Sequence, residues 1–342
     1  MGTVSIIGLD LAKKVFQVHG IDQEHKVIVQ KQLVRSEVLS WFSKQPPCLV
    51  GIEACATSHY WAQEIRKLGH RVRLIPPAYV KPYVRRQKND RADAAAICEA
   101  VSRPSMRFVE IKTKDQQAIQ VLHRARELLL QQTTQTGNAL RAHLAEFGWA
   151  LPKGNAGLSQ AIDTAQNTKD DIPVVAQQAM CCLVDRLKAL KQEVAKLDKQ
   201  MRAWHKSNAD SQRLAGIPNI GVVTASAIVA TAGTGKQFKS GREFAAFIGI
   251  VPRQNSSGGK ERLGRISKKG NPYLRKLLVL GATSQLRSNR IRQAPGGQWF
   301  GKLIRRKPKR VAAVALANKT ARIAWAVLTK GESYRETMAV AA

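Results

Sequence analysis

The sequence has 342 residues, of which 44% are hydrophobic, so it can build the cores of one large or two to three ordinary domains. It carries 56 Lys and Arg against 24 Asp and Glu, a net charge of +32 that favours binding to nucleic acid over an anionic membrane, for which no anchor or lipidation motif is present. Five cysteines without a CxxC pair argue against a disulfide framework and a zinc site.

The N-terminal part of the sequence alternates between short apolar runs and amphipathic segments, as in an α/β domain. The predicted strands are Val4–Leu9, Val15–His19, Lys26–Val34, Cys48–Ile52 and Arg71–Ile75. The predicted helices are Glu37–Lys44, Thr57–Leu68 and Asp90–Val101. The order is therefore three strands, a helix, a strand, a helix and a strand, followed by a further helix. Since no signal peptide precedes the first strand, we expect a cytoplasmic protein, associated with the bacterial nucleoid when active.

Two long helices are predicted in the middle of the chain. The first spans about Asp115–Phe147, and the polar segment Lys153–Lys169 is expected to be a loop or linker. The second carries a heptad seam, in which apolar residues recur by steps of three and four from Met180 to Trp204. The seam has two interpretations: an intramolecular helical hairpin with the preceding helix, or a coiled coil that joins two copies of the chain.

The last third of the chain is strongly basic but contains regularly placed apolar residues. Residues 251–310 hold 17 Lys and Arg and one acid, Glu261, so they contribute 17 − 1 = +16, half of the net charge. A disordered basic tail is one interpretation, but the interleaved leucines and aromatic residues predict a folded helical domain with a basic face. Gly216 and Gly221 frame either an ordinary glycine turn or the turn of a helix–hairpin–helix, whose backbone N–H groups would bind a DNA phosphate.

Four carboxylates are placed where a divalent metal site could form. Asp10 and Glu53 each follow or end an apolar strand, and ligands of open sheets bind at the carboxyl ends of parallel strands. Asp90 and Asp93 are three residues apart at a helix start, so they share one face. Four clustered carboxylates repel one another unless cations neutralise them, and Mg²⁺ or Mn²⁺ prefers oxygen ligands. The alternative for the helical pair is a favourable interaction with the helix dipole.

The residues around these acids resemble the motifs of a known enzyme family. The segments Gly8–Leu9–Asp10, Gly51–Ile52–Glu53–Ala54 and Lys88–Asn89–Asp90–Arg91–Ala92–Asp93–Ala94 resemble those of DEDD-type insertion-sequence transposases. The resemblance covers nearly the whole chain. It implies an N-terminal RuvC-like (RNase H-like) domain, a separate C-terminal transposase domain, and Mg²⁺ or Mn²⁺ held by the four acids. The basic residues beside the acids are expected to bind nucleic acid; they are Lys81, Arg85, Arg86 and Lys88.

A serine in the C-terminal domain is the candidate nucleophile. From composition alone, residues 249–260 form a flexible loop and residues 265–275 a phosphate-binding loop leading into a helix. The family resemblance implies that a serine before a glycine in the first segment attacks a DNA phosphate and forms a covalent 5′-phosphoserine-type linkage. The matching residue is Ser257, and the adjacent Ser256 is the alternative. The basic residues expected to contact phosphate are Arg253, Lys260, Arg262, Arg265, Lys268, Lys269 and Arg275.

These features together predict three domains and one leading function. The domains are residues 1–110 (RuvC-like), 111–210 (long helices with the heptad region) and 211–342 (C-terminal transposase domain). The leading function is a recombinase of a mobile element; the alternatives are a Holliday-junction resolvase-like nuclease and a non-catalytic nucleic-acid scaffold. The resemblance further implies guidance by a structured bridge RNA that pairs with donor and target DNA. A homo-oligomer, dimer or tetramer, is expected to bring the carboxylates and Ser257 together.

Overall fold

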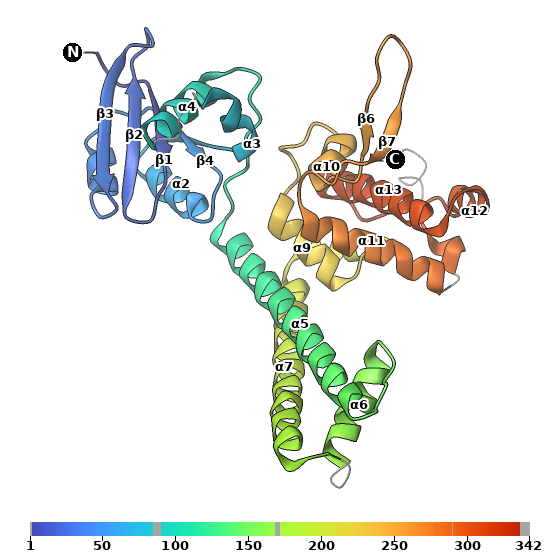
Figure 1. The fold of residues 1–342 in the computed structure, drawn as a ribbon. Coiled ribbons are helices and arrows are strands. Elements are labelled where there is room, and N and C mark those ends of the chain that lie inside the picture. The colour runs from blue at the N-terminus through green and yellow to red at the C-terminus, as the bar shows by residue number, and fades with distance from the viewer. Residues whose placement is uncertain (1, 85–89, 168–171, 289, 336–342) are drawn as a thin grey trace. The chain divides into compact units, whose positions relative to one another are not determined.

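A computed structural model of the chain describes residues 2–84, 90–167, 172–288 and 290–335 (Figure 1). It divides into two compact units, Met1–Thr113 and Lys114–Ala342, referred to below as the N-terminal and C-terminal units. The C-terminal unit contains both long central helices and the basic last third. The division into three domains stays a prediction.

The N-terminal unit is built on one mixed sheet with the strand order β3-β2-β1-β4-β5. The strands are β1 (Ile6–Asp10), β2 (Val15–Ile21), β3 (Val27–Val34), β4 (Leu49–Glu53) and β5 (Arg71–Ile75). β1, β2 and β3 pair antiparallel, whereas β1, β4 and β5 pair parallel. The helices between the strands are α1 (Val38–Ser43) and α2 (Ser58–Lys67). The predicted order of elements is confirmed, and the sheet is compatible with an RNase H-like fold.

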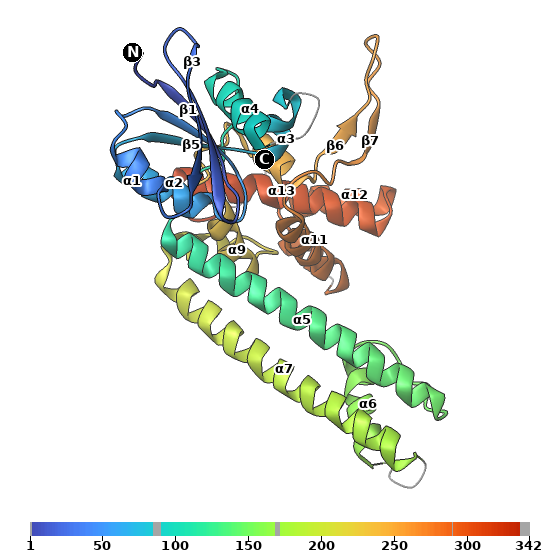
Figure 2. The ribbon, with the colours of Figure 1, turned by 60° about the vertical axis from the view of Figure 1, so that its left-hand side comes forward.

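The two faces of this sheet pack against different helices, as Figure 2 shows for α2 and α4. Because side chains alternate along a strand, Ile7 and Leu9 lie on the face covered by α1 and α2, where they pack with Trp61. The opposite face is covered by α4 (Asp90–Ser102), whose Ile97 and Val101 are buried beside Ile75 of β5. Short helical turns, α3 (Pro77–Val80) and η1 (Lys81–Tyr83), precede α4.

Two glycines let α4 come very close to the sheet. Gly8 of β1 and Gly51 of β4 are paired in the parallel register. A Cβ atom on Gly8 would lie 2.1 Å from the backbone oxygen of Ala94, and a Cβ atom on Gly51 would lie 2.7 Å from the Cβ atom of Val101. The backbone of α4 therefore rests where side chains would otherwise stand, and the glycine pair sets the height of this helix above the sheet.

The C-terminal unit begins with two long antiparallel helices, α5 (Lys114–Glu146) and α7 (Val174–Ser207), joined through α6 (Asn155–Asn167) (Figures 1 and 2). The intramolecular interpretation of the heptad seam is confirmed, because its residue Leu187 packs in one cluster with Leu140 of α5. The predicted loop Lys153–Lys169 is wrong, since most of it is α6. This helix buries Leu158, Ala161, Ile162 and Ala165, which recur at helical spacing against the long pair.

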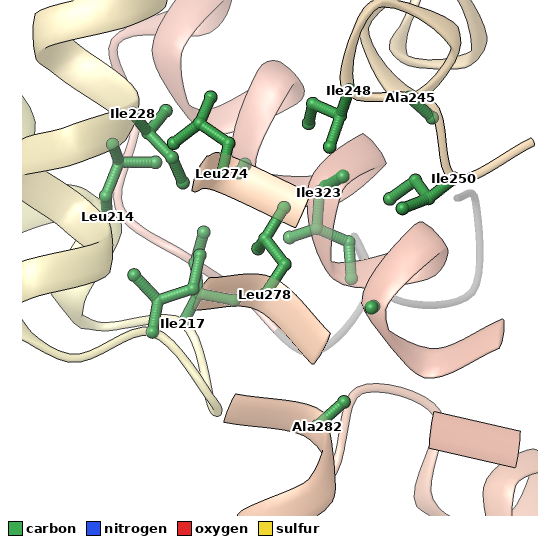
Figure 3. Close-up of a cluster of buried hydrophobic side chains, with 14 of the residues drawn as sticks. Leu214, Ile217, Ile228, Ala245, Ile248, Ile250, Leu274, Leu278, Ala282 and Ile323 are labelled. Carbon is green, nitrogen blue, oxygen red and sulfur yellow. The ribbon is translucent and has the colours of Figure 1, made fainter. Parts of the chain in front are cut away.

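The rest of this unit is a helical bundle with one short hairpin. Its helices are α8 (Ala209–Ala215), α9 (Val222–Ala232), α10 (Gly241–Ile248), α11 (Pro272–Arg287), the 3-10 turn η2 (Arg290–Gln293), α12 (Gly297–Arg306) and α13 (Lys309–Lys330). The strands β6 (Pro252–Gln254) and β7 (Leu263–Ile266) pair antiparallel. Figure 3 shows the core, in which Leu214 of α8, Leu278 of α11 and Ile323 of α13 converge.

Helix α13 forms the centre of this bundle. It alone among the described helices is long and apolar enough to cross a membrane on length and composition, but 56% of its most apolar window is already buried by protein. Its buried positions include Leu316, Ala317, Ala324 and Val327, which pack in the core of the bundle. Helix α13 is therefore a core helix of this bundle.

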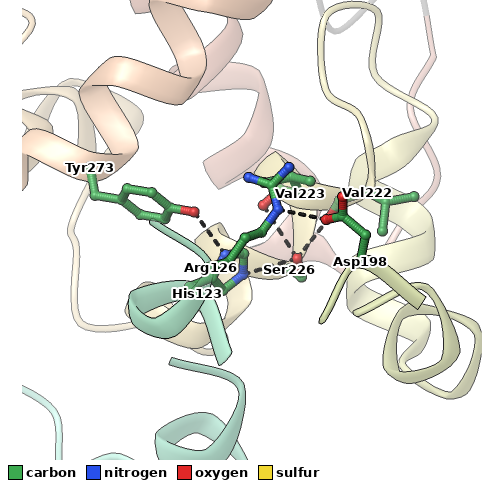
Figure 4. Close-up of polar contacts among 7 residues, drawn as sticks. All are labelled: His123, Arg126, Asp198, Val222, Val223, Ser226 and Tyr273. Atoms are coloured by element: carbon green, nitrogen blue, oxygen red, sulfur yellow. Dashed lines mark hydrogen bonds and ion pairs between the residues drawn. The ribbon is translucent and has the colours of Figure 1, made fainter. Parts of the chain in front are cut away.

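A buried polar network connects α5 to the bundle (Figure 4). The Ser226 hydroxyl donates to the carbonyl of Val222 at 2.7 Å, so it accepts the hydrogen bond from Nε2 of His123 at 3.1 Å. The remaining nitrogen of His123, Nδ1, then accepts from the Tyr273 hydroxyl at 2.9 Å. Burial, with smaller contributions from nearby arginines, lowers the pKa of His123 to about 4. The imidazole is therefore neutral, and its tautomer is fixed by its two partners.

Candidate carboxylate and serine sites

Asp10 and Glu53 lie at the carboxyl ends of two parallel neighbouring strands. The register pairs Leu9 with Ile52, so Asp10 and Glu53 come next to each other where β1 and β4 end. Alternation along each strand puts both carboxylates on the face that carries Gly8 and Gly51. This is the face covered by α4, and both acidic side chains are partly buried.

Helix α4 brings Asp93 to the same place. The backbone of the next residue, Ala94, lies directly over Gly8, two positions from Asp10 along β1. Burial raises the pKa of Glu53, and the negative charge of Asp93 raises it further. Both effects disfavour the ionised carboxylate. A cation bound beside it would offset them, because an opposite charge favours the ionised form.

The arrangement is a partial match to a metal site. No group of three or more His, Cys, Asp or Glu side chains in the described part of the chain is close enough to hold a metal ion. Asp90 is the first residue of α4, but its side chain lies outside the described residues. The acids that are described offer only oxygen donors at one end of the sheet, which fits Mg²⁺ or Mn²⁺ better than a softer metal.

The basic residues expected beside the acids are only partly described. Lys81 is exposed in η1. Arg85, Arg86 and Lys88 lie outside the described residues. Their expected contact with nucleic acid therefore stays a prediction.

Ser257 lies in the turn of the β6–β7 hairpin, which corrects the expectation of a flexible loop. Ser257 and Lys260 form an antiparallel bridge, and the Lys260 N–H donates to the Ser257 carbonyl at 3.1 Å. The two residues between them, Gly258 and Gly259, have φ values of 56° and 74°, as a type I′ turn requires. The sequence Gly258–Gly259 is typical of a hairpin turn. The strands on either side were not predicted because their residues are mostly polar.

The hydroxyl groups of the two candidate serines differ. The Ser256 hydroxyl accepts a hydrogen bond from the Arg262 N–H at 3.1 Å across the hairpin. The exposed Ser257 makes no side-chain hydrogen bond to any residue that the structure describes. Ser256 therefore supports the hairpin, while the Ser257 hydroxyl is free to meet a ligand.

The base of the hairpin is fixed to the end of α10 by two close backbone contacts. A Cβ atom on Gly249 would lie 2.0 Å from the carbonyl oxygen of Lys269, and one on Gly270 would lie 1.9 Å from that of Phe247. Both glycines have positive φ. The Arg275 guanidinium also donates to the Ile248 carbonyl at 2.8 Å, so this predicted phosphate ligand has a structural contact as well.

The other basic candidates surround the hairpin and its base. All of them are exposed, and they are Arg253, Lys260, Arg262, Arg265, Lys268 and Lys269. The predicted phosphate-binding loop is in part strand β7, and the remainder leads into α11 as expected. These positive charges therefore lie along the hairpin and at its base, and Lys260 lies in the turn that carries Ser257.

The glycine turn between α8 and α9 has free space beside Gly221 but not beside Gly216. Gly216 ends α8, and Gly221 is the N-cap of α9. A Cβ atom on Gly221 would meet no other atom within 4 Å, so the fold itself does not require glycine there. Gly221 is exposed, and phosphate binding at this turn stays a prediction.

Several basic side chains on α13 were not among the sequence-based candidates. Arg310, Lys319 and Arg322 line a groove beside the hairpin, together with Trp299 of α12. On α13, Lys319 and Arg322 are three positions apart and share one face, whereas Arg310 lies near the start of the helix, nine positions before Lys319. Residues 311–317, between Arg310 and Lys319, are all apolar and separate the basic residues in the sequence.

Comparison with known proteins finds transposases along the whole chain. A family model described as "Transposase", of the IS110 DEDD type, matches residues 7–148, and one described as "Transposase IS116/IS110/IS902 family" matches residues 211–295. A probable family 20 transposase of Pseudomonas aeruginosa is 47% identical over 97% of this chain and 99% of its own length. The transposase for insertion sequence element IS1328 of Yersinia enterocolitica is 38% identical over 97% of this chain and 98% of its own. That for IS1111A of Coxiella burnetii is 38% identical over 98% and 92%, respectively.

Proposed function

The chain belongs to the IS116/IS110/IS902 family of transposases, enzymes that cut and rejoin DNA, and from this premise we propose that Ser257 is its nucleophile. The observation that carries the proposal is the position of this residue. Its exposed side chain stands at the turn of a hairpin whose base is fixed to α10, and the exposed residues Lys260 and Arg262 belong to the same hairpin. A DNA phosphate brought to these charges meets the hydroxyl directly.

The proposed step exchanges one phosphoester bond for another. Oγ of Ser257 attacks the phosphorus atom, and the bond from phosphorus to the 3′ oxygen breaks. The proton lost by the serine goes to the departing 3′ oxygen, and the 5′ side stays attached as a phosphoserine diester. Arg253, Lys260 and Arg262 stabilise the negative charge that develops on the phosphate oxygens. Rejoining is the reverse reaction, with a 3′ hydroxyl of the other strand as the attacking group.

The N-terminal carboxylates supply the second part of the proposed site. The DEDD domain implies dependence on a divalent metal ion, and we assign Asp10, Glu53, Asp90 and Asp93 as the residues that would hold Mg²⁺ or Mn²⁺. A metal ion bound there would neutralise negative charge on the DNA phosphate. The geometry of the sheet supports this assignment, because it gathers Asp10, Glu53 and the start of α4 at one edge.

The test is a covalent-adduct assay with a DNA substrate that carries the ends of the element. The wild-type protein should form a protein–DNA adduct that survives denaturation, and Ser257→Ala should form none. Ser256→Ala is the matched control: it loses the hydrogen bond from Arg262 but keeps the nucleophile, so its adduct should persist. If the adduct disappears in Ser256→Ala and persists in Ser257→Ala, Ser256 is the nucleophile and the assignment of Ser257 is refuted.

The same assay separates the metal and RNA parts of the proposal. Chelation should reduce adduct formation, and added Mg²⁺ should restore it. We further propose that a structured bridge RNA guides the reaction in the cytoplasm. The net charge of +32 is consistent with binding of both RNA and DNA but does not itself demonstrate guidance. A discrete RNA should then copurify, and its removal by nuclease should abolish the adduct. Unchanged adduct formation after complete removal would refute guidance.

The alternative, a resolvase-like nuclease, is not favoured. Relatives described as transposases align over almost the entire chain, including the basic last third, which hydrolysis by a carboxylate-bound metal does not need. The adduct assay distinguishes the two functions. Cleavage that continues in Ser257→Ala without any adduct would support the nuclease.

A further inference from the structure

A groove of about 1100 Å³ runs beside the hairpin in the C-terminal unit. It is lined by the base of the hairpin, including Gly264 and Ile266, by one face of α13, and by Trp299 of α12. Asn318 of α13 donates to the carbonyl of Ile250 at 3.1 Å, which fixes α13 to the chain just before β6. This hydrogen bond holds two walls of the groove together, α13 and the base of the hairpin.

Helix α13 presents different chemistry to its two sides. Its core side is formed by residues such as Leu316 and Ala317, which are fully buried. Its groove side carries small apolar residues in the middle, Val311, Val314 and Ala315. Basic residues stand at both ends of this apolar stretch, with Arg310 on one side and Lys319 and Arg322 on the other. The groove thus combines an apolar floor with positively charged edges.

None of the described residues that line the groove is acidic. Its five basic side chains are Arg265, Lys268, Arg310, Lys319 and Arg322. None of the five makes an ion pair with a carboxylate in the described part of the chain. Five unneutralised cations around one groove repel each other, so the partner that fits them carries negative charges at intervals.

An exposed aromatic ring completes the site. The Trp299 side chain is 39% exposed. The ammonium group of Lys319 lies 5.0 Å from the centre of its ring. A base that stacks on the indole would therefore bring its own phosphate close to a positive charge, which is the combination used by proteins that bind single-stranded nucleic acid.

We propose that this groove binds a single-stranded segment of the substrate DNA, with unstacked bases on Trp299 and the apolar floor and with phosphates on the basic edges. The bases of a duplex are stacked on each other, so a duplex cannot use the floor. A volume of about 1100 Å³ also lies above the roughly 300–1,000 Å³ of small-molecule sites, so several linked nucleotides fit better than one small anion.

The choice of DNA over RNA rests on the function proposed for Ser257. Strand β7 lines the groove and leads to the turn that carries this serine. From Ile266 to Lys260 the hairpin covers about 20 Å, at roughly 3.3 Å per residue. A strand held in the groove therefore lies within a few nucleotides of the hydroxyl, and the strand that the serine attacks is DNA.

The experiment measures binding of a labelled oligothymidylate to the full-length protein by fluorescence anisotropy at several salt concentrations. Trp299→Ala should weaken binding about tenfold, as the loss of one stacked base does, and Trp299→Phe should restore most of it. Lys319→Ala should make the slope of log K against log salt shallower by about 0.7. Lys330→Ala removes an exposed lysine of the same helix outside the groove and serves as the control. Circular dichroism checks that each variant is folded.

Three outcomes would overturn the proposal: wild-type affinity in Trp299→Ala and Lys319→Ala, an equal loss in Lys330→Ala, or weakened binding of oligouridylate with unchanged binding of oligothymidylate. The last would assign the groove to RNA. If Trp299→Ala fails to fold, the Lys319→Ala salt slope decides. The covalent-adduct assay is independent of these measurements, so a groove that binds DNA without any adduct would refute Ser257 chemistry and leave the groove standing.

Discussion

At the scale of single residues, the hydrogen-bond partners of His123 show how its buried imidazole is held neutral. His123 contacts Ser226 and Tyr273, which lie 103 and 150 positions away. No local pattern predicts such a network, and the three residues were not among the sequence-based candidates. Asp10 and Glu53 are the opposite case, because each ends an apolar strand and parallel strands align their carboxyl ends.

The neutral state of His123 predicts a pH-dependent stability. Its pKa of about 4 lies below the ordinary value of 6.5, so the unfolded chain binds a proton first as the pH falls. Stability should therefore decrease from about pH 6.5 to about pH 4, by up to about 3 kcal/mol from this residue. Chemical denaturation at pH 7 and pH 5 should show a smaller loss in His123→Gln than in the wild type.

The matched control for this prediction is His143→Gln. His143 is exposed near the other end of the same helix, α5. This change should leave the pH dependence as it is in the wild type. Equal pH dependence in the wild type and in His123→Gln would contradict the prediction.

At the scale of elements, periodicity predicted the strands and long helices but not the short irregular pieces. The five strands and α4 end within a few residues of their predicted bounds. Helix α6 was missed because its polar residues outnumber the four apolar ones that it buries. The hairpin was missed because its strands are three and four residues long and exposed, so they show no alternation of apolar and polar residues. The hairpin strands bury almost no side chain, and α6 buries only one face.

The glycine pair beneath α4 gives a graded prediction. Gly8→Ala would place a methyl group 2.1 Å from a backbone oxygen of α4, whereas Gly51→Ala would place one 2.7 Å from the Cβ atom of Val101, so both changes push on α4 and the first pushes it further. We expect the first to cost about 3 kcal/mol of unfolding free energy and the second about 1 kcal/mol. Urea denaturation measures both. The first should also displace Asp93 and reduce adduct formation, and equal effects of the two changes would contradict this account of α4.

At the scale of the whole molecule, the two proposed halves of the active site belong to different compact units. The carboxylates lie in Met1–Thr113 and Ser257 in Lys114–Ala342. We propose that they meet in an oligomer, with each half given by a different copy. A mixture of Asp10→Asn and Ser257→Ala proteins should then recover up to about a quarter of wild-type adduct if two copies pair at random. A mixture as inactive as its components would show that one copy must supply both halves.

The position of Ser257 at the tip of an exposed hairpin has a consequence for the order of events in recombination. In the proposed reaction, the described residues of its own unit would leave a covalent intermediate on Ser257 exposed, so those residues could not select among incoming 3′ hydroxyls. On this proposal, the hairpin would not distinguish one incoming strand from another during rejoining. Fidelity would then be decided earlier, when strands are recruited and held, and errors of target choice would arise from recruitment.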